Sequence, residues 1–353
     1  MRTPLIVSAL ALVVSSAATA QGAAPCTTAT AQCEQWVALA GGPARSMVYS
    51  SYALNKPNTA VTRAFILVHG TGRNADHYFE TATAAAFLDG ALKNTVVIAP
   101  HFVSDTDKVA TNEVLWPNRG DSWRSGGMST SNPTISAFDF MDEIVRQLSN
   151  KKNFPNLKKI VIAGHSAGGQ FVTRYEMANK VHGTTGVDMS YVVANPSTYA
   201  WPSATRPLAS GNADSATANH EALGPNGTKI NSEFSYGPFD VTKVPAFNNW
   251  PTGLEKRTGY TAQMTDAQLK KNLIERPTTY LFGQVDVLPL GGFDQSKAAM
   301  AQGPTRRARG EAFIKFLTDS LGAKPSAMIV SECGHNDRCV FTTNEVFPVI
   351  FPQ

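Results

Sequence analysis

The stretch that decides the fold is Lys158–Arg174, which reads Lys-Lys-Ile-Val-Ile-Ala-Gly-His-Ser-Ala-Gly-Gly-Gln-Phe-Val-Thr-Arg. Its apolar run Ile160–Ala163 predicts a strand buried on both faces of a parallel sheet, and apolar residues at near-helical spacing follow the glycines. A sharp strand-to-helix turn leaves no room for side chains at Gly164 and Gly168 and pushes the serine hydroxyl out of the sheet. Ser166 is therefore a candidate nucleophile; the alternative is a glycine-rich turn with an inert serine.

Length and composition bound the fold class and the partners. The chain has 353 residues, of which 42% are hydrophobic and 16% charged. That is enough for a sizeable core, as one large α/β domain or two small ones. The formal net charge is only +4, with no basic run interleaved with aromatic residues. Nucleic acid is therefore not an expected partner.

The first 20 residues have the three parts of a secretory signal peptide. Arg2 gives a positive start, Leu5–Val14 is an apolar segment too short to span a bilayer, and Ala18-Thr19-Ala20 resembles a cleavage site. We predict cleavage after Ala20, which leaves residues 21–353 as a secreted or periplasmic domain. The alternative is a short N-terminal anchor. No later stretch of the sequence is long and apolar enough to predict a membrane span.

Export makes the cysteines informative, because oxidising compartments favour disulfides. The chain has four cysteines, which allow three pairings: Cys26, Cys33, Cys333 and Cys339. Short spacing within each half of this set favours pairing the first two with each other and the last two with each other. No Cys-x-x-Cys motif occurs, so no zinc site is expected, and no other metal or cofactor motif is present.

A second strand predicts part of an anion-binding site. The run from Ala64 to Val68 ends in His69-Gly70-Thr71-Gly72, and a glycine-rich loop in this position supplies one donor of an oxyanion hole. The N–H of Thr71, or that of Gly72, would act together with the N–H of Ala167. The alternative is an ordinary turn that closes a strand, and His69 itself is predicted to be structural.

Further elements follow from hydrophobic periodicity. Strands are expected over 47–54 (weakly, at an edge), 95–99, 189–194, 278–283 and 327–330, and helices over 75–92, 134–149 and 305–321. Three arginines in the last helix, Arg306, Arg307 and Arg309, are expected to form a solvated face.

Two aromatic segments are candidates for a substrate cleft. The loop after the strand 95–99 contains Trp123, and the stretch 195–276, which contains Trp201, has few periodic runs and many aromatic residues. That stretch is too long for a simple connection, so we predict an insertion that forms a lid or cleft wall over the site. Both tryptophans are predicted to bind substrate; for the loop that contains Trp123 the alternative is packing by its own aromatic residues.

An acid and a base each follow a predicted strand. Asp286 comes just after 278–283, where a carboxylate could orient a histidine, and His335 lies in the loop after the last strand. Asp294, in a glycine-rich loop, is the second candidate for the acid, ahead of Asp240 and Asp266.

The chain order Ser166, Asp286, His335 is that of α/β-hydrolases. Together with His69-Gly70 and the Gly-His-Ser-Ala-Gly motif, it makes the sequence resemble the α/β-hydrolase superfamily from about residue 61 to the end, outside 195–276. A closer similarity is to secreted esterases and polyester depolymerases of that superfamily. The resemblance implies an α/β fold with a mostly parallel central sheet, helices on both faces, and no cofactor. The sequence departs from the family pattern at Thr71, where a Gly-Gly run is expected after His69-Gly70.

The chemistry implied by this resemblance is acyl transfer. The favoured function is hydrolysis of carboxylic esters, on a small-molecule or polymeric substrate. An amidase or peptidase with the same three residues is the first alternative. A non-catalytic binding protein on the same fold is the second, and the presence of all three residues argues against it.

Overall fold

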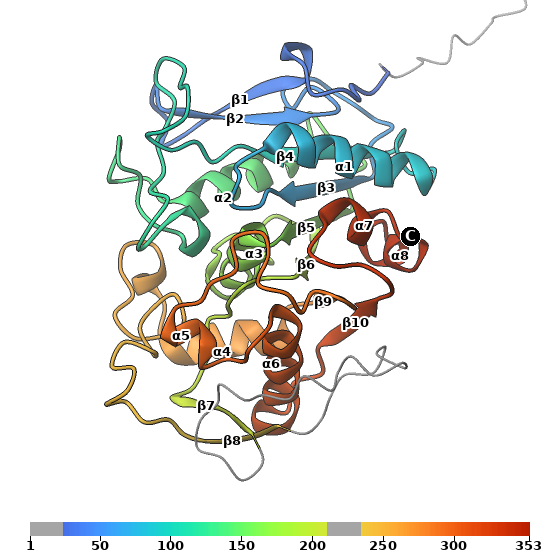
Figure 1. The fold of residues 1–353 in the computed structure, drawn as a ribbon. Coiled ribbons are helices and arrows are strands. Elements are labelled where there is room, and N and C mark those ends of the chain that lie inside the picture. The colour runs from blue at the N-terminus through green and yellow to red at the C-terminus, as the bar shows by residue number, and fades with distance from the viewer. Residues whose placement is uncertain (1–23, 210–233) are drawn as a thin grey trace, which may run out of the picture.

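The computed structural model describes residues 24–209 and 234–353, so the predicted signal peptide lies outside the described residues. The centre of the described chain is an eight-stranded sheet in the order β1-β2-β4-β3-β5-β6-β9-β10 (Figure 1). The strands from β4 to β10 in this order are parallel to one another, whereas β2 is antiparallel to both of its neighbours. The sheet is therefore mostly parallel, as the sequence predicts.

The strands of this sheet coincide with the predicted runs, except for β1, which no predicted run covers. Their bounds are β1 Glu34–Ala38, β2 Arg45–Ser50, β3 Arg63–Val68, β4 Thr95–Pro100, β5 Lys159–His165, β6 Asp188–Ala194, β9 Thr278–Gly283 and β10 Ser326–Val330. Every residue of β4 is buried, and β5 is buried after its first residue. Such continuous burial is expected of strands with a helical layer on each face.

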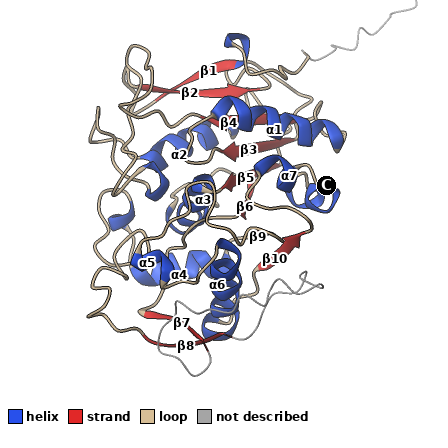
Figure 2. Cartoon of the chain, in the orientation of Figure 1, coloured by secondary structure: helices blue, strands red, loops and turns tan. Residues whose placement is uncertain are grey.

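Helices cover both faces of the sheet (Figures 1 and 2). One face packs against α1 Ala75–Leu88, α7 Asp337–Phe341 and α8 Phe347–Ile350. The other packs against α2 Ala137–Leu148, α3 Ala167–Ala178, α4 Asp266–Glu275 and α6 Arg306–Leu321. The alternation of side chains along a strand separates the two cores, so that Phe65 joins the first and Ile66 the second.

Short elements complete the described chain. The 3₁₀ turns are η1 Ala31–Cys33, η2 Trp123–Ser125, η5 Thr261–Gln263 and η6 Asn344–Val346, and the short helix α5 spans Lys297–Met300. The predicted edge strand 47–54 is β2, and it is not an edge, because β1 pairs along its outer side.

The stretch 195–276 is more ordered than its sequence indicates. It holds the antiparallel pair β7 Thr205–Ala209 and β8 Phe234–Pro238, and residues between them lie outside the described part. The expectation of few periodic runs is wrong for α4, which packs on α3 through buried leucines. The hydroxyl of Tyr260 donates to Asp142 on α2 at 2.8 Å. Parts of the described stretch therefore belong to the core.

Two disulfides join cysteines that are close in sequence. One links Cys26 to Cys33, and the other links Cys333 to Cys339, on either side of His335. These are the two local pairings that the spacing favours.

Candidate active site

Ser166 occupies a strained turn between β5 and α3. Its backbone angles are φ 58° and ψ −117°, in a region that a residue with a side chain rarely adopts. A Cβ atom on Gly164 would lie 2.2 Å from the Gly168 carbonyl oxygen, and one on Gly168 would lie 2.1 Å from the Val68 carbonyl oxygen. Both positions therefore require glycine, and their close contacts hold the start of α3 against the end of β3.

A continuous hydrogen-bond chain connects Ser166, His335 and Asp286. The Ser166 Oγ lies 2.8 Å from His335 Nε2, and His335 Nδ1 lies 2.8 Å from Asp286 Oδ2. The three residues follow β5, β10 and β9, whose carboxyl ends lie at the same edge of the parallel sheet. Asp294 takes no part in this chain, since its carboxylate accepts a hydrogen bond from the Ser296 N–H instead.

Arg306 holds the other oxygen of the Asp286 carboxylate. This arginine is only 1% exposed, and its Nη1 donates to Asp286 Oδ1 at 3.3 Å. Its Nη2 donates to the carbonyl oxygens of Leu290 and Gly291 at 2.6 and 3.0 Å. A Cβ on Gly291 would lie 2.8 Å from His335 Cδ2, so this loop packs directly against the imidazole. One guanidinium thus holds both the Asp286 carboxylate and the loop that packs on the His335 ring.

The prediction of a solvated arginine face on α6 is wrong. Arg306, Arg307 and Arg309 are all buried. Arg307 Nε donates to Glu311 at 2.8 Å, and Arg309 Nη1 donates to the Ser197 carbonyl at 2.6 Å. The position of these arginines at the start of α6 already indicated that other groups hold them. Cations are disfavoured at a helix N-terminus unless another group stabilises them.

Asn195 supports the histidine loop and was not identified from the sequence. It follows β6 with a positive φ of 47°, a conformation that asparagine tolerates better than most residues. Its Oδ1 accepts from the Gly283 N–H at 2.8 Å, and its Nδ2 donates to the Gly334 carbonyl at 3.3 Å. The side chain therefore ties the end of β9 to the residue before His335.

The loop that contains Thr71 passes beside the serine. A Cβ on Gly70 would lie 3.7 Å from Ser166 Cβ, and one on Gly292 would lie 3.1 Å from Thr71 Cγ2. Ala167 is the first residue of α3, where N–H groups have no partner within the helix. The structure therefore brings the segments that carry both expected backbone donors next to Ser166.

The expectation that Trp123 and Trp201 line a cleft is wrong, since both side chains are fully buried. Trp123 stacks on Phe102 with ring centroids 5.1 Å apart and lies 4.8 Å from the His69 ring. Trp201 packs on Phe313 at 5.4 Å. Both tryptophans are part of the core, and for Trp123 this is the alternative that the sequence left open.

Two further histidines near the site are neutral. Burial, followed by the neighbouring His101, lowers the pKa of His69 to about 3, and its Nε2 accepts from the Phe102 N–H at 3.1 Å. Burial also lowers the pKa of His165, whose ring centroid lies 4.6 Å from that of His335. A neutral ring next to His335 avoids repulsion when His335 takes up a proton.

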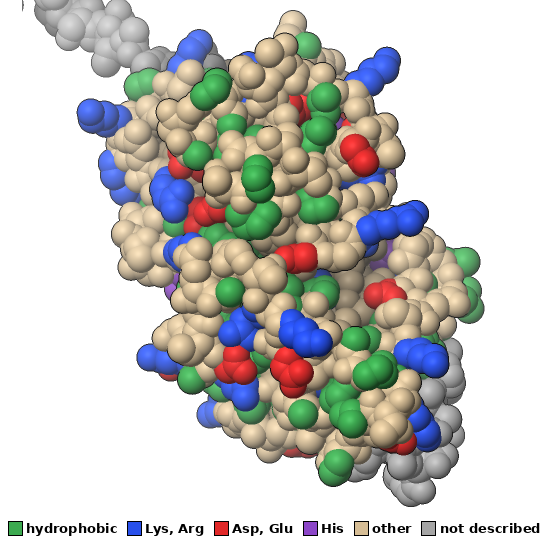
Figure 3. All heavy atoms as spheres, turned by 90° about the vertical axis from the view of Figure 1, so that its left-hand side faces the viewer, with side chains coloured by type: hydrophobic (Ala, Val, Ile, Leu, Met, Phe, Trp, Pro, Cys, Tyr) green, Lys and Arg blue, Asp and Glu red, His purple; other side chains and the backbone are tan. Residues whose placement is uncertain are grey.

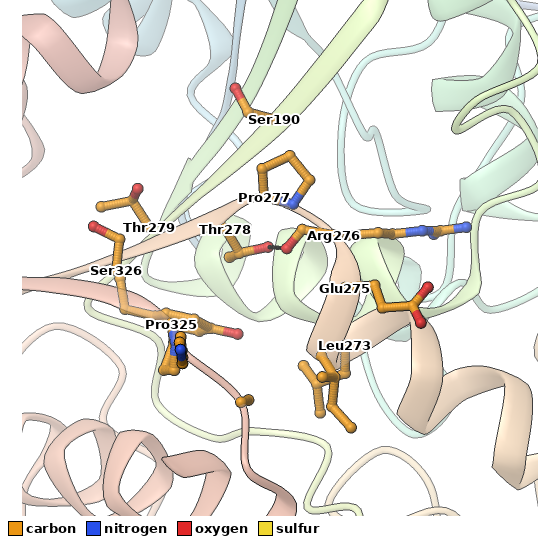
Figure 4. A pocket seen from close by; sticks show the side chains of 13 residues that line it. Ser190, Leu273, Glu275, Arg276, Pro277, Thr278, Thr279, Pro325 and Ser326 are labelled. Atoms are coloured by element: carbon orange, nitrogen blue, oxygen red, sulfur yellow. Dashed lines mark hydrogen bonds between the residues drawn. The ribbon is translucent and has the colours of Figure 1, made fainter.

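A cavity of about 260 Å³ lies away from these residues (Figure 4). It is lined by Thr278 and Ser326, at the start of β9 and β10, whereas the site residues follow the ends of these strands. In this cavity the Thr278 hydroxyl donates to the Arg276 carbonyl oxygen at 3.3 Å. This cavity therefore lies at the edge of the sheet opposite to that of Ser166.

The described residues contain neither a candidate metal cluster nor a candidate membrane span. No group of three or more His, Cys, Asp or Glu side chains in them is placed to hold a metal ion. Within the same residues, no helix combines the length and the apolar character needed to cross a membrane.

Comparison with known proteins agrees with this geometry. The sequence profile described as "Alpha/beta hydrolase family" matches residues 65–347, most of the chain. The chain belongs to the alpha/beta hydrolase family. Its eight-stranded, mostly parallel sheet with helices on both faces has the architecture of an alpha/beta hydrolase. A search of curated proteins finds no match to it.

Solved structures share the alpha/beta hydrolase fold with this chain. LpqC, a poly(3-hydroxybutyrate) depolymerase from Bordetella parapertussis, is 18% identical with a TM-score of 0.58, over 87% of this chain and 84% of LpqC. Poly(aspartic acid) hydrolase-1 from Sphingomonas sp. KT-1 is 22% identical with a TM-score of 0.57, over 87% of this chain and 94% of that one. At these identities the similarity concerns the fold.

Proposed function

We propose that the protein is a serine hydrolase that cleaves carboxylic esters through an acyl-enzyme on Ser166. The observation that carries this proposal is the unbroken hydrogen-bond chain from Ser166 through His335 to Asp286, at a strained turn that opens a helix. An inert serine would not require that strain or two glycines without room for a Cβ.

The reaction follows from the positions of the protons. His335 Nε2 accepts the Ser166 proton as Oγ attacks the acyl carbon, and Asp286 stabilises the imidazolium through the Nδ1–H. Backbone N–H groups of Thr71 and Ala167 stabilise the tetrahedral oxyanion. The imidazolium then protonates the departing alkoxide oxygen. Water releases the acyl group by the same route, with His335 accepting its proton.

The proposed place of action is outside the cytoplasm. The two local disulfides support export, since such bonds persist in oxidising compartments. The signal peptide over residues 1–20 is part of this proposal. N-terminal sequencing of protein recovered from the exported fraction should begin at Gln21. A mature protein that still begins at Met1 would contradict it.

A matched panel of substrates tests the ester assignment. It should compare p-nitrophenyl esters of increasing chain length, insoluble polyesters, and p-nitroanilides with the same acyl groups. We expect a higher kcat/KM for each ester than for its anilide, and loss of both activities in Ser166→Ala. A preference for the anilides would assign an amidase. No turnover and no acyl-enzyme with any member would favour a binding protein.

A further inference from the structure

A cavity of about 400 Å³ lies along α3, the helix that follows Ser166. One wall is formed by Gln170 and Arg174 on α3, one and two turns beyond Ser166. Another is formed by Arg124, in η2, and a third by Asp294, shortly after the Gly291 loop that packs on His335. Pro251 and Thr252, from the stretch predicted to form a cleft wall, also line it.

Arg174 is a buried cation held only by neutral groups. It is 1% exposed, and it donates to the carbonyl oxygens of Pro251 and Gln170 at 3.0 and 2.9 Å and to the Thr198 hydroxyl at 2.9 Å. Burial lowers its pKa to about 9, so it stays charged at neutral pH. A charge taken out of water without an opposite charge is costly, and an anion at this position would offset that cost.

Arg124 adds a second positive charge to the same cavity. It donates to the Ser122 hydroxyl at 3.1 Å and to the Asn118 carbonyl oxygen at 2.6 Å. In the described chain no carboxylate forms an ion pair with Arg124 or Arg174. Asp294 is the cavity's one acidic lining residue, so two arginines and one aspartate leave a single positive charge.

The other buried arginines of this chain differ from this pair. Arg306 and Arg307 each contact a carboxylate. Arg206 and Arg309 are held by carbonyl oxygens, as Arg174 is, but neither lines the cavity. The combination of an unpaired guanidinium and open space in front of it belongs to the Arg124 and Arg174 cavity.

We propose that this cavity is a substrate subsite that binds a carboxylate, so that the enzyme prefers acidic esters over neutral ones. The inference rests on the proposed ester hydrolysis at Ser166. Guanidinium groups bind carboxylates through paired N–H donors. The cavity provides two guanidinium groups, those of Arg124 and Arg174. The surface mixes both charges on the side that Figure 3 turns to the viewer, where α5 lies in Figure 1. A preference for acids would thus come from the cavity.

Helix geometry sets the distance between the two ends of the substrate. Gln170 lies about 6 Å from Ser166 along the helix axis, at 1.5 Å per residue. Side chains on a helix lean toward its N-terminus, and Arg174 accordingly donates to the Gln170 carbonyl. A carboxylate several bonds from the scissile carbonyl would reach the cavity, as in the half-ester of a medium-length dicarboxylic acid.

The test compares two esters that differ in one charge. The p-nitrophenyl half-ester of adipate and p-nitrophenyl hexanoate have the same leaving group and acyl length. We expect wild-type kcat/KM to favour the acidic ester by about 10- to 100-fold, which is typical of hydrogen bonds to charged groups. Arg124→Gln should reduce this ratio about tenfold or more. Asp294→Asn should increase it, because it removes the competing carboxylate.

The matched control is Arg119→Gln. Arg119 is an exposed residue of the same loop and does not line the cavity. Its removal changes the net charge equally, and solvent screens its effect, so the ratio should stay near that of wild type. A wild-type ratio near one would overturn the proposal. So would a ratio that Arg124→Gln leaves unchanged, or one that falls equally in Arg119→Gln.

A binding measurement separates this subsite from the ester chemistry. Calorimetry with adipate alone should show binding to wild type and to Ser166→Ala, and loss of binding in Arg124→Gln. If neither ester is cleaved, the proposed function fails, and adipate binding still decides the subsite. Absence of adipate binding, or tighter binding of inorganic phosphate than of adipate, would overturn the carboxylate assignment.

Discussion

Replacing Asp286 with asparagine removes one charge and almost no volume from the proposed triad. In the structure, one carboxylate oxygen accepts from His335 Nδ1 at 2.8 Å and the other from Arg306 Nη1 at 3.3 Å. Because Arg306 can only donate, the asparagine oxygen must face Arg306 and its NH₂ group must face His335. The imidazole Nδ1 then becomes an acceptor, and the proton moves to Nε2, where it points at Ser166.

That tautomer cannot accept the serine proton, so the chemical step loses its base. The wrong tautomer in a Ser-His-Asp triad costs about 10⁴-fold in kcat, which corresponds to about 5.4 kcal/mol. Loss of the buried carboxylate beside Arg306 should also lower the free energy of unfolding, by at most about 3–5 kcal/mol. The kinetic assay should therefore be run well below the melting temperature of the variant.

The assay is steady-state hydrolysis of a p-nitrophenyl ester, with circular dichroism to verify that the variant is folded. Asp294→Asn is the comparison, because Asp294 is the second acid candidate and its carboxylate accepts from the Ser296 N–H. It should lose less than about tenfold, since it orients no catalytic group. If Asp294→Asn lost more activity than Asp286→Asn, the assignment of the acid would be refuted.

Three other changes test separate parts of the structure. The double variant Cys333→Ser/Cys339→Ser should lose about 2 kcal/mol of stability. Its activity should fall by more than this modest loss of stability explains, because the disulfide restrains the loop of His335. A loss of activity that matches the unfolded fraction would contradict this. Arg306→Lys should lower kcat and alter its pH profile, because one ammonium cannot make the contacts of the guanidinium; an unchanged profile would assign it a purely structural role. Burial raises the pKa of Glu176 to about 8, above its unfolded value of about 4.3. Between these two pKa values the folded state holds a proton that the unfolded state has lost. The stability of the wild type should therefore fall, relative to that of Glu176→Gln, as pH rises from about 4.3 to about 8. Denaturant titrations at pH 5, 7 and 9 measure that gap, and a constant gap would show that Glu176 keeps an ordinary pKa.

Local patterns in the sequence were sufficient to predict most of the sheet and the turn around Ser166. Strand period, glycines and the order of three residues are properties of short segments. The helix α4 was missed although a local signal existed, since the Thr265 side chain caps it by accepting from the Gln268 N–H. A threonine followed three residues later by glutamine is such a start signal.

Burial of polar side chains could not be predicted in the same way. Arg306 was expected to be solvated, because its partner Asp286 belongs to another element and only the folded sheet brings them together. Trp123 was expected in a cleft, but the fold encloses its loop between Phe102 and α3. Such contacts depend on how elements pack, which composition and periodicity do not specify.

The proposed hydrolysis depends above all on Ser166 as the nucleophile of an acyl-transfer reaction. Treatment of the mature protein with a fluorophosphonate, followed by peptide mass spectrometry, tests it directly. We expect one covalent phosphonyl adduct on Ser166, formed with loss of ester hydrolysis, and no adduct in a folded Ser166→Ala variant. An adduct on another serine, or ester hydrolysis that continues in the Ser166→Ala variant at the wild-type rate, would contradict it.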